Sequence, residues 1–236
     1  MTKGRGRPSR SSLALGALVA VAAVVFATRV SGAARPAVEL PSPAVDSPSA
    51  TAKTETAVFA GGCFWGVQSV FQHVKGVVRA TSGYAGGFTD RPSYEDVSTG
   101  RTGHAESVRV VFDPSQVSYG RLLRVFFSVI HDPTQLNRQG PDVGTQYRSE
   151  VFYTTDEQKK VAEAYIDQLA KAHVFARPIV TQVAKLKEFF AAEAYHQNYA
   201  EEHPTQPYIM IYDAPKVTNL KKEFPELYTE KLAAHD

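Results

Sequence analysis

The chain of 236 residues has a single cysteine, Cys63, and a single tryptophan, Trp65. No cysteine and histidine residues have the spacing of a metal site, so we expect no bound metal, and no motif requires a cofactor. With Cys63 as the only cysteine, none stands directly behind the apolar N-terminal run, so a lipid-anchored lipoprotein is not expected. The sequence also lacks internal repeats, which argues against a repeat architecture.

The first 33 residues lack acidic side chains and are typical of an export signal. Basic residues within the first ten precede an apolar run over residues 13–27, and the small residues 31–33 offer a cleavage site. The run is shorter than the roughly 20 residues of a membrane-spanning helix. We predict a signal peptide over residues 1–33 and an exported protein, periplasmic or membrane-tethered on the extracytoplasmic side. An uncleaved anchor is the alternative.

Removal of that segment changes the charge of the protein. The formal net charge of +2 includes five basic and no acidic side chains in residues 1–33, which leaves −3 for the remainder. Binding to a nucleic acid depends on positive charge placed against the phosphates. A nucleic-acid partner is therefore not expected.

Composition divides the rest of the chain into three parts. Residues 34–55 are rich in Pro, Ala, Ser and Thr without apolar periodicity, which predicts a disordered linker. Residues 56–225 alternate strand-like and helix-like patterns, which predicts one α+β domain with helices packed on a sheet. Residues 226–236 form a C-terminal tail. Within the domain we expect a helix over about 186–202 and a strand over 208–212.

The stretch around Cys63 is the strongest local signal. Gly61 and Gly62 suit a tight turn from a strand into a helix, and apolar residues recur at helical spacing afterwards. Cys63 is therefore predicted near the first turn of an amphipathic helix, where unpaired amides and the helix dipole favour the thiolate. Trp65 falls on the polar side of this helix, which favours a contact surface over the core.

Glu106 is the candidate acid. It alternates with Val108, Val110 and Phe112, so its carboxyl is predicted on the same sheet face as three apolar side chains. Partial burial there would raise its pKa and keep a proton available near neutral pH. The alternation fits a solvated glutamate at a strand edge equally well.

Six motifs together resemble the A-type peptide methionine sulfoxide reductases. They are residues 62–66 (GCFWG), 83–87 (GYAGG), 103–106 (GHAE), 131–133 (HDP), 138–149 (RQGPDVGTQYRS) and 195–199 (YHQNY). The resemblance covers about Thr56 to about Pro225, in the order of the family. It implies a two-layer ferredoxin-like plait, with a mixed sheet, extra loops and a C-terminal helix. It also implies thiol-dependent reduction of methionine S-sulfoxide, free and in proteins, and so repair of oxidised proteins.

The resemblance assigns catalytic roles to five residues. Cys63 matches the nucleophile, and Glu106 matches the acid that protonates the departing oxygen. Tyr94 and Tyr147 match tyrosines that donate hydrogen bonds to that oxygen. Asp142 matches an aspartate that helps to hold the site, although a turn residue after Gly140-Pro141 fits it as well.

The resemblance also implies a substrate site. Phe64 and Trp65 match the aromatic wall that accepts the terminal methyl group of the substrate, and Gly62 lies beside them. His196 and Tyr199 would line the pocket. For His196, a structural histidine is the alternative interpretation.

One departure from the family concerns regeneration. Many members carry further cysteines near the C-terminus that attack the sulfenic acid, and this chain has none. Cys63 should therefore stay as sulfenic acid until an external thiol reduces it. The expected donor is a thioredoxin-like protein.

Two other classes of function stay open. A cysteine hydrolase would pair Cys63 with His104 or His196 as base and Asp142 as orienting group. A non-enzymatic binding module would use Trp65 and the tyrosines, and would not need the thiol.

Overall fold

The computed structural model describes Met1, residues 35–47 and residues 53–235. Apart from Met1, the signal peptide predicted over residues 1–33 lies outside the described residues. Within the part of the chain that the structure describes, no helix combines the length and the apolar character needed to cross a bilayer.

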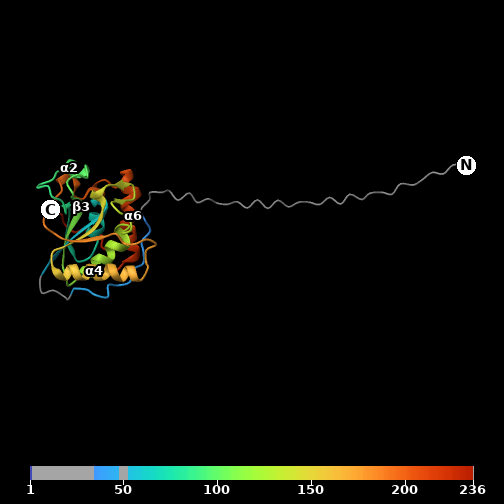
Figure 1. Ribbon diagram of the computed structural model, residues 1–236, viewed down its shortest axis with the longest axis horizontal. Helices are drawn as coiled ribbons and strands as arrows, with labels where there is room; N and C mark the ends of the chain where they lie inside the picture. Colours follow the sequence, from blue (N-terminus) through green and yellow to red (C-terminus); the bar gives the residue numbers. More distant parts are fainter. Residues whose placement is uncertain (2–34, 48–52, 236) are drawn as a thin grey trace. The chain divides into compact units, whose positions relative to one another are not determined.

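A six-stranded sheet forms the centre of the domain (Figure 1). In spatial order its strands are β7 (Gln182–Lys185), β6 (Ser149–Tyr153), β1 (Glu55–Gly61), β3 (Ala105–Phe112), β2 (Val77–Ala85) and β8 (Phe189–Ala191). The sheet is mixed, because β6 and β7 pair in parallel while the other neighbours are antiparallel. A separate two-stranded ribbon consists of β4 (Arg138–Gln139) and β5 (Asp142–Val143).

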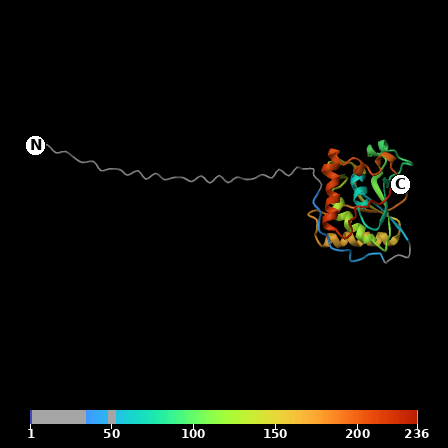
Figure 2. The same ribbon diagram turned by 180° about the vertical axis from the view of Figure 1, so that it is seen from behind.

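Helices complete the domain, which confirms the predicted α+β class. The α-helices are α1 (Phe64–Gln72), α2 (Tyr94–Ser98), α3 (Tyr119–Val125), α4 (Asp156–Lys171), α5 (Tyr199–Glu202) and α6 (Ala214–Glu223). Two π-helical segments are η1 (Phe126–Ile130) and η4 (Ile209–Asp213), and two 3-10 turns are η2 (Thr145–Tyr147) and η3 (Ala194–His196). In Figure 1, α4 lies along the lower end of the domain and α6 along one side, and Figure 2 shows the same arrangement from behind.

The main core lies between the sheet and the helices. Val108, Val110 and Phe112 on β3 are fully buried and belong to this core together with Val67 and Phe71 of α1. The opposite face of the sheet has a smaller apolar cluster made of Val58, Ala60, Ala85, Ala105 and Phe152. The alternation along β3 therefore sends its even-numbered side chains to the helix-covered face, as predicted.

Two predicted elements are wrong. The stretch 186–202 is not one helix, because it contains β8, the turn η3 and the short helix α5. Asn198 adopts a left-handed conformation with φ of 55° just before α5, which breaks any continuous helix. Residues 208–212 do not form a strand, because η4 continues directly into α6.

The disordered linker predicted over residues 34–55 is also wrong within its described part. Residues 35–47, blue in Figure 1, pass α6 and run below α4. Leu40 is 2% exposed and belongs to the main core. The Val38 amide donates to the Ser128 carbonyl at 3.1 Å, and Arg124 Nε donates to the Leu40 carbonyl at 2.8 Å. We call residues 35–47 the N-terminal strap.

Hydrogen bonds to the helices α3 and α4 hold this strap in place. Tyr165 and Gln168 of α4 donate to the carbonyls of Pro41 and Ser42, each at 2.9 Å. Asp46 accepts a hydrogen bond from the Gly120 amide at 2.8 Å, at the start of α3. An extended segment ordered in this way buries few of its own side chains, so composition and periodicity could not reveal it.

The strap should contribute to the stability of the domain. Replacing Leu40 with alanine should lower the free energy of unfolding by about 2–5 kcal/mol, because it removes a buried leucine from the main core. Chemical denaturation monitored by circular dichroism measures this change. The matched control is Glu39→Ala, an exposed neighbour, for which a change within about 0.5 kcal/mol is expected. Equal stability of the Leu40→Ala variant and the wild type would show that the strap is not part of the fold.

Candidate active site

The turn from β1 into α1 places Cys63 at the start of the helix. Gly62 has φ of +91°, and a Cβ atom there would lie 2.6 Å from Cβ of Gln139. Glycine is therefore required for both the backbone conformation and the close approach. Cys63 follows as the N-cap residue of α1, which is the position predicted from the two glycines.

The environment of the Cys63 thiol differs from the sequence-based expectation. Burial raises its pKa well above the ordinary value, and the nearby Glu106 and Asp213 carboxyls raise it further. A hydrogen bond from the Trp65 amide and the charge of Lys216 lower the pKa, but they do not outweigh burial. The helix start alone therefore does not make Cys63 a thiolate, and the free protein holds it mainly as the thiol.

Glu106 lies directly beside the first turn of α1. Its Oε2 accepts a hydrogen bond from the Phe64 amide at 3.0 Å, one residue after Cys63. The side chain is 2% exposed, so the interpretation as a solvated glutamate at a strand edge is wrong. Burial raises the pKa of Glu106 to about 8. The hydrogen bond from the Phe64 amide lowers this pKa, and the carboxyls of Asp142 and Asp213 raise it. Glu106 is thus mostly protonated at neutral pH.

Tyr94 lies between β2 and β3, and Tyr147 lies between β5 and β6. Tyr94 begins α2, and its amide donates to Oε1 of Glu193 at 2.8 Å, while Tyr147 ends η2. Burial raises the pKa of both phenols, and the neighbouring Glu106 carboxyl raises it further. Both tyrosines therefore remain neutral hydrogen-bond donors at working pH.

Asp142 is held by a residue that the sequence analysis did not identify. The Tyr208 hydroxyl donates a short hydrogen bond to Oδ2 of Asp142. Burial raises the pKa of Asp142, while this bond and the charge of Lys216 lower it. Tyr208 lies just before η4, in the stretch expected to be a strand, so no sequence pattern pointed to it.

The aromatic side chains form a layered wall next to Cys63. Phe64 is buried and packs 5.0 Å from the His196 ring, measured between ring centroids. Trp65 is only partly buried and stacks on Tyr199 at a centroid distance of 3.9 Å. The edge of Tyr208 meets Trp65 at 6.1 Å. Trp65 therefore packs at the edge of the core, and its role as a contact surface for the substrate stays a prediction.

His196 orients this wall. Its Nδ1 accepts a hydrogen bond from Nε1 of Trp65 at 3.2 Å, and its ring lies 4.4 Å from the Tyr94 ring. Burial lowers the pKa of His196, so the ring is neutral at neutral pH. His196 therefore positions Trp65, while its Nε2 is buried without a hydrogen-bond partner among the described residues.

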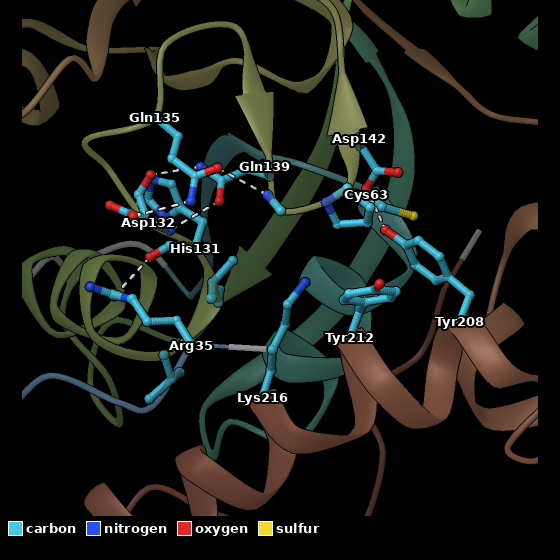
Figure 3. A pocket seen from close by; sticks show the side chains of 14 residues that line it. Arg35, Cys63, His131, Asp132, Gln135, Gln139, Asp142, Tyr208, Tyr212 and Lys216 are labelled. Atoms are coloured by element: carbon cyan, nitrogen blue, oxygen red, sulfur yellow. Dashed lines mark hydrogen bonds between the residues drawn. The ribbon is translucent and has the colours of Figure 1, made fainter. Parts of the chain in front are cut away.

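A cavity of about 90 Å³ opens beside Cys63 (Figure 3). Asp142, Tyr208, Tyr212 and Lys216 surround the end that holds Cys63. Arg35, His131, Asp132 and Gln135 line the far end, and Gln139 lies between the two ends, against the Gly62 turn. Of the predicted site residues, Cys63 and Asp142 line this cavity. Among those that do not line it are Glu106, Tyr94, Tyr147, Phe64, Trp65 and His196.

The arrangement does not provide the groups of a cysteine hydrolase. Asp142 accepts from Tyr208 instead of orienting a histidine, and His196 Nδ1 is occupied by Trp65. His104 packs against the edge of Phe190. His131 lines the cavity, but its ring nitrogens bond the Phe126 carbonyl and the Ser149 hydroxyl, and burial lowers its pKa to about 3. Within the part of the chain that the structure describes, none of these histidines is hydrogen-bonded to Cys63.

Comparisons with known proteins agree with the motifs. Residues 55–228 match the family described as peptide methionine sulfoxide reductase. The peptide methionine sulfoxide reductase MsrA 2 of Mesorhizobium japonicum is 62% identical over 178 residues, which cover 75% of this chain and 91% of that protein.

Two solved structures are also similar. Methionine sulfoxide reductase A of Corynebacterium diphtheriae has a TM-score of 0.58 at 36% identity, covering 75% of this chain and 89% of that one. Mxr1 of Saccharomyces cerevisiae in its reduced form has a TM-score of 0.60 at 31% identity, covering 72% of this chain and 93% of that one.

Proposed function

The chain belongs to the peptide methionine sulfoxide reductase family, and we propose that Cys63 and Glu106 carry out the reaction of that family here. The protein is an oxidoreductase that reduces methionine sulfoxide, free or in oxidised proteins, to methionine, and so repairs those proteins. One observation carries the assignment of the residues. The buried, protonated Glu106 carboxyl is hydrogen-bonded to the amide that follows Cys63.

Cys63 supplies the electrons and Glu106 supplies the proton. The Cys63 sulfur attacks the sulfoxide sulfur and forms a bond to it. As the sulfoxide oxygen moves to Cys63, its bond to the methionine sulfur and the new sulfur–sulfur bond both break. The methionine sulfur gains two electrons and the cysteine sulfur loses two, which gives methionine and Cys63 sulfenic acid. The proton that Glu106 gives to the oxygen is balanced by the proton that leaves the Cys63 thiol.

Tyr94 and Tyr147 are suited to hold the sulfoxide oxygen. Each is a neutral phenol that can donate a hydrogen bond to an oxygen that gains negative charge. Both phenols interact electrostatically with Cys63 and Glu106, which supports this role. Asp142 accepts a hydrogen bond from Tyr208 and is suited to hold the site through hydrogen bonds.

The aromatic wall is suited to receive the methyl group. Phe64 and Trp65 offer apolar surface beside Cys63, and His196 holds Trp65 in place. A slot that accepts one methyl group fixes which epimer can direct its oxygen toward Glu106. Membership in the family assigns this selectivity to the S epimer.

Regeneration depends on a thiol from outside the chain. Cys63 is the only cysteine, so its sulfenic acid has no internal partner. An external thiol forms a mixed disulfide with Cys63 and releases water, and a second thiol group then frees Cys63. A thioredoxin-like protein, which carries two thiols, suits both steps.

The absence of a second cysteine predicts the stoichiometry of the reaction. Without a reductant, reduced enzyme mixed with methionine S-sulfoxide should form one methionine per Cys63 and then stop. Chromatographic quantification of methionine measures this yield, and mass spectrometry should find a dimedone adduct on Cys63. Addition of a thioredoxin system should restore turnover.

The Cys63→Ser variant is the matched control and should form no methionine. Continued turnover of the wild type without any thiol would contradict the mechanism. Full function of the Cys63→Ser variant would instead support the binding-module interpretation.

For the topology of the sheet, we propose a ferredoxin-like plait. Its support is the order β6-β1-β3-β2 of the central strands, each antiparallel to its neighbour. Helix α1 connects β1 to β2, and α3 lies in the connection from β3 to β6. This is a βαββαβ sequence of elements, to which β7, β8 and the C-terminal helix α6 are added.

The N-terminal pattern favours a protein that is exported from the cytoplasm. Its support is the basic region, the apolar run over residues 13–27 and the small residues 31–33. Expression of the full chain in a bacterium with two membranes should yield a periplasmic protein whose N-terminus, read by mass spectrometry, lies near residue 33. Retention of the whole chain in the cytoplasm would overturn the export assignment.

A further inference from the structure

Asp213 and Lys216 form a buried ion pair next to the start of α1. Lys216 Nζ lies 2.9 Å from Asp213 Oδ1, and the two side chains are 14% and 0% exposed. The second carboxyl oxygen of Asp213 is buried and has no hydrogen-bond partner among the described residues. Burying such a pair costs desolvation energy that its attraction repays only with further hydrogen bonds, which this Asp213 oxygen lacks.

Gly66 shows how closely the pair approaches the first turn of α1. A Cβ atom at Gly66 would lie 2.1 Å from Asp213 Oδ1 and 2.8 Å from Lys216 Nζ. Gly66 is only three residues after Cys63, so both charges lie against the turn that Cys63 caps. A carboxylate at this place interacts with the same positive end of the helix dipole that would stabilise a Cys63 thiolate.

Lys216 is the cation at the Cys63 end of the cavity. Figure 3 shows its side chain rising from α6 into the cavity that Cys63 lines. The other cation of this cavity is Arg35, which Figure 3 places at the far end. The Arg35 guanidinium donates to the carbonyls of Phe127, Ser128 and His131, so it is engaged away from Cys63.

Most other titratable groups around Cys63 are acids. Besides Lys216 on α6 and Asp213 on η4, the groups that face Cys63 are Glu106 on β3, Asp142 on β5, Tyr94 on α2, Tyr147 on η2 and Tyr208 before η4. Each of these acids opposes a negative charge on Cys63 when it is itself ionised. Lys216 is therefore well placed to balance a thiolate.

We propose that the Asp213–Lys216 pair controls how readily Cys63 ionises, with the ammonium favouring the thiolate and the carboxylate opposing it. The two residues are positioning residues that act through charge and do not touch the substrate. This role rests on the proposed function of Cys63 as the nucleophile. The pKa of the Cys63 thiol agrees in sign, because Asp213 raises it and Lys216 lowers it.

Opposite effects of two neutralising variants test this proposal. Lys216→Met leaves Asp213 uncompensated, so the pH profile of Cys63 alkylation by iodoacetamide should move to higher pH. The rate at neutral pH should fall about tenfold if the pKa rises by about one unit. Asp213→Asn leaves the ammonium alone, so the profile should move to lower pH and the rate at neutral pH should rise. Lys216→Arg should restore the wild-type profile.

The matched control is Lys222→Met, which removes an exposed lysine of the same helix and should leave the profile unchanged. Single-turnover reduction of methionine sulfoxide should follow the same order as alkylation. If the pair were merely structural, both neutralising variants would be alkylated more slowly, but the pH midpoint of alkylation would not move. That result would overturn the proposal. Shifted alkylation without sulfoxide reduction would instead refute the proposed function and leave the charge control standing.

A measurement on the wild type avoids variants that fail to fold. The coupling is reciprocal, so an ionised Cys63 raises the pKa of Lys216, and capping Cys63 removes this effect at the pH values where the thiol would have ionised. Nuclear magnetic resonance of protein labelled at the lysine Cε atoms should show an earlier titration of Lys216 after Cys63 is capped as a neutral methyl disulfide. An unchanged Lys216 midpoint would overturn the proposal.

Discussion

The hydrogen bond from the Phe64 amide to the Glu106 carboxyl is the contact on which the site depends. It joins the first turn of α1 to the start of β3, so the thiol and the acid are held by two elements that the core packs together. The Gly-Gly turn brings the helix start to this place, and the alternation of β3 sends Glu106 to the same face. Catalytic geometry and core packing are therefore set by the same contacts.

Burial has opposite consequences for the two reacting groups, and both suit the chemistry. It keeps Glu106 protonated, which is useful for an acid, and it keeps Cys63 mostly as a thiol, which protects it from unwanted oxidation. Attack on sulfur then requires ionisation of Cys63 inside the site. The pair of Asp213 and Lys216 gives the fold a way to adjust that step.

The sequence predicted the features that depend on local periodicity. The Cys63 turn and the α+β class follow from glycine placement and apolar spacing. The alternation of β3 left a buried and a solvated Glu106 equally open, and only the structure shows that it is buried. The strap over residues 35–47 could not be predicted, because hydrogen bonds from distant helices order it. Tyr208 and Lys216 were missed for a similar reason, since η4 and α6 approach Cys63 only through tertiary packing.

The protonation state of Glu106 tests the central claim most directly. Infrared difference spectra between the wild type and the Glu106→Gln variant, recorded across a pH titration, report whether that carboxyl holds a proton. The account predicts a protonated carboxyl band at pH 7 that disappears with a midpoint near the pKa of about 8. A carboxylate already formed at pH 7, with a midpoint near that of an exposed glutamate, would contradict it.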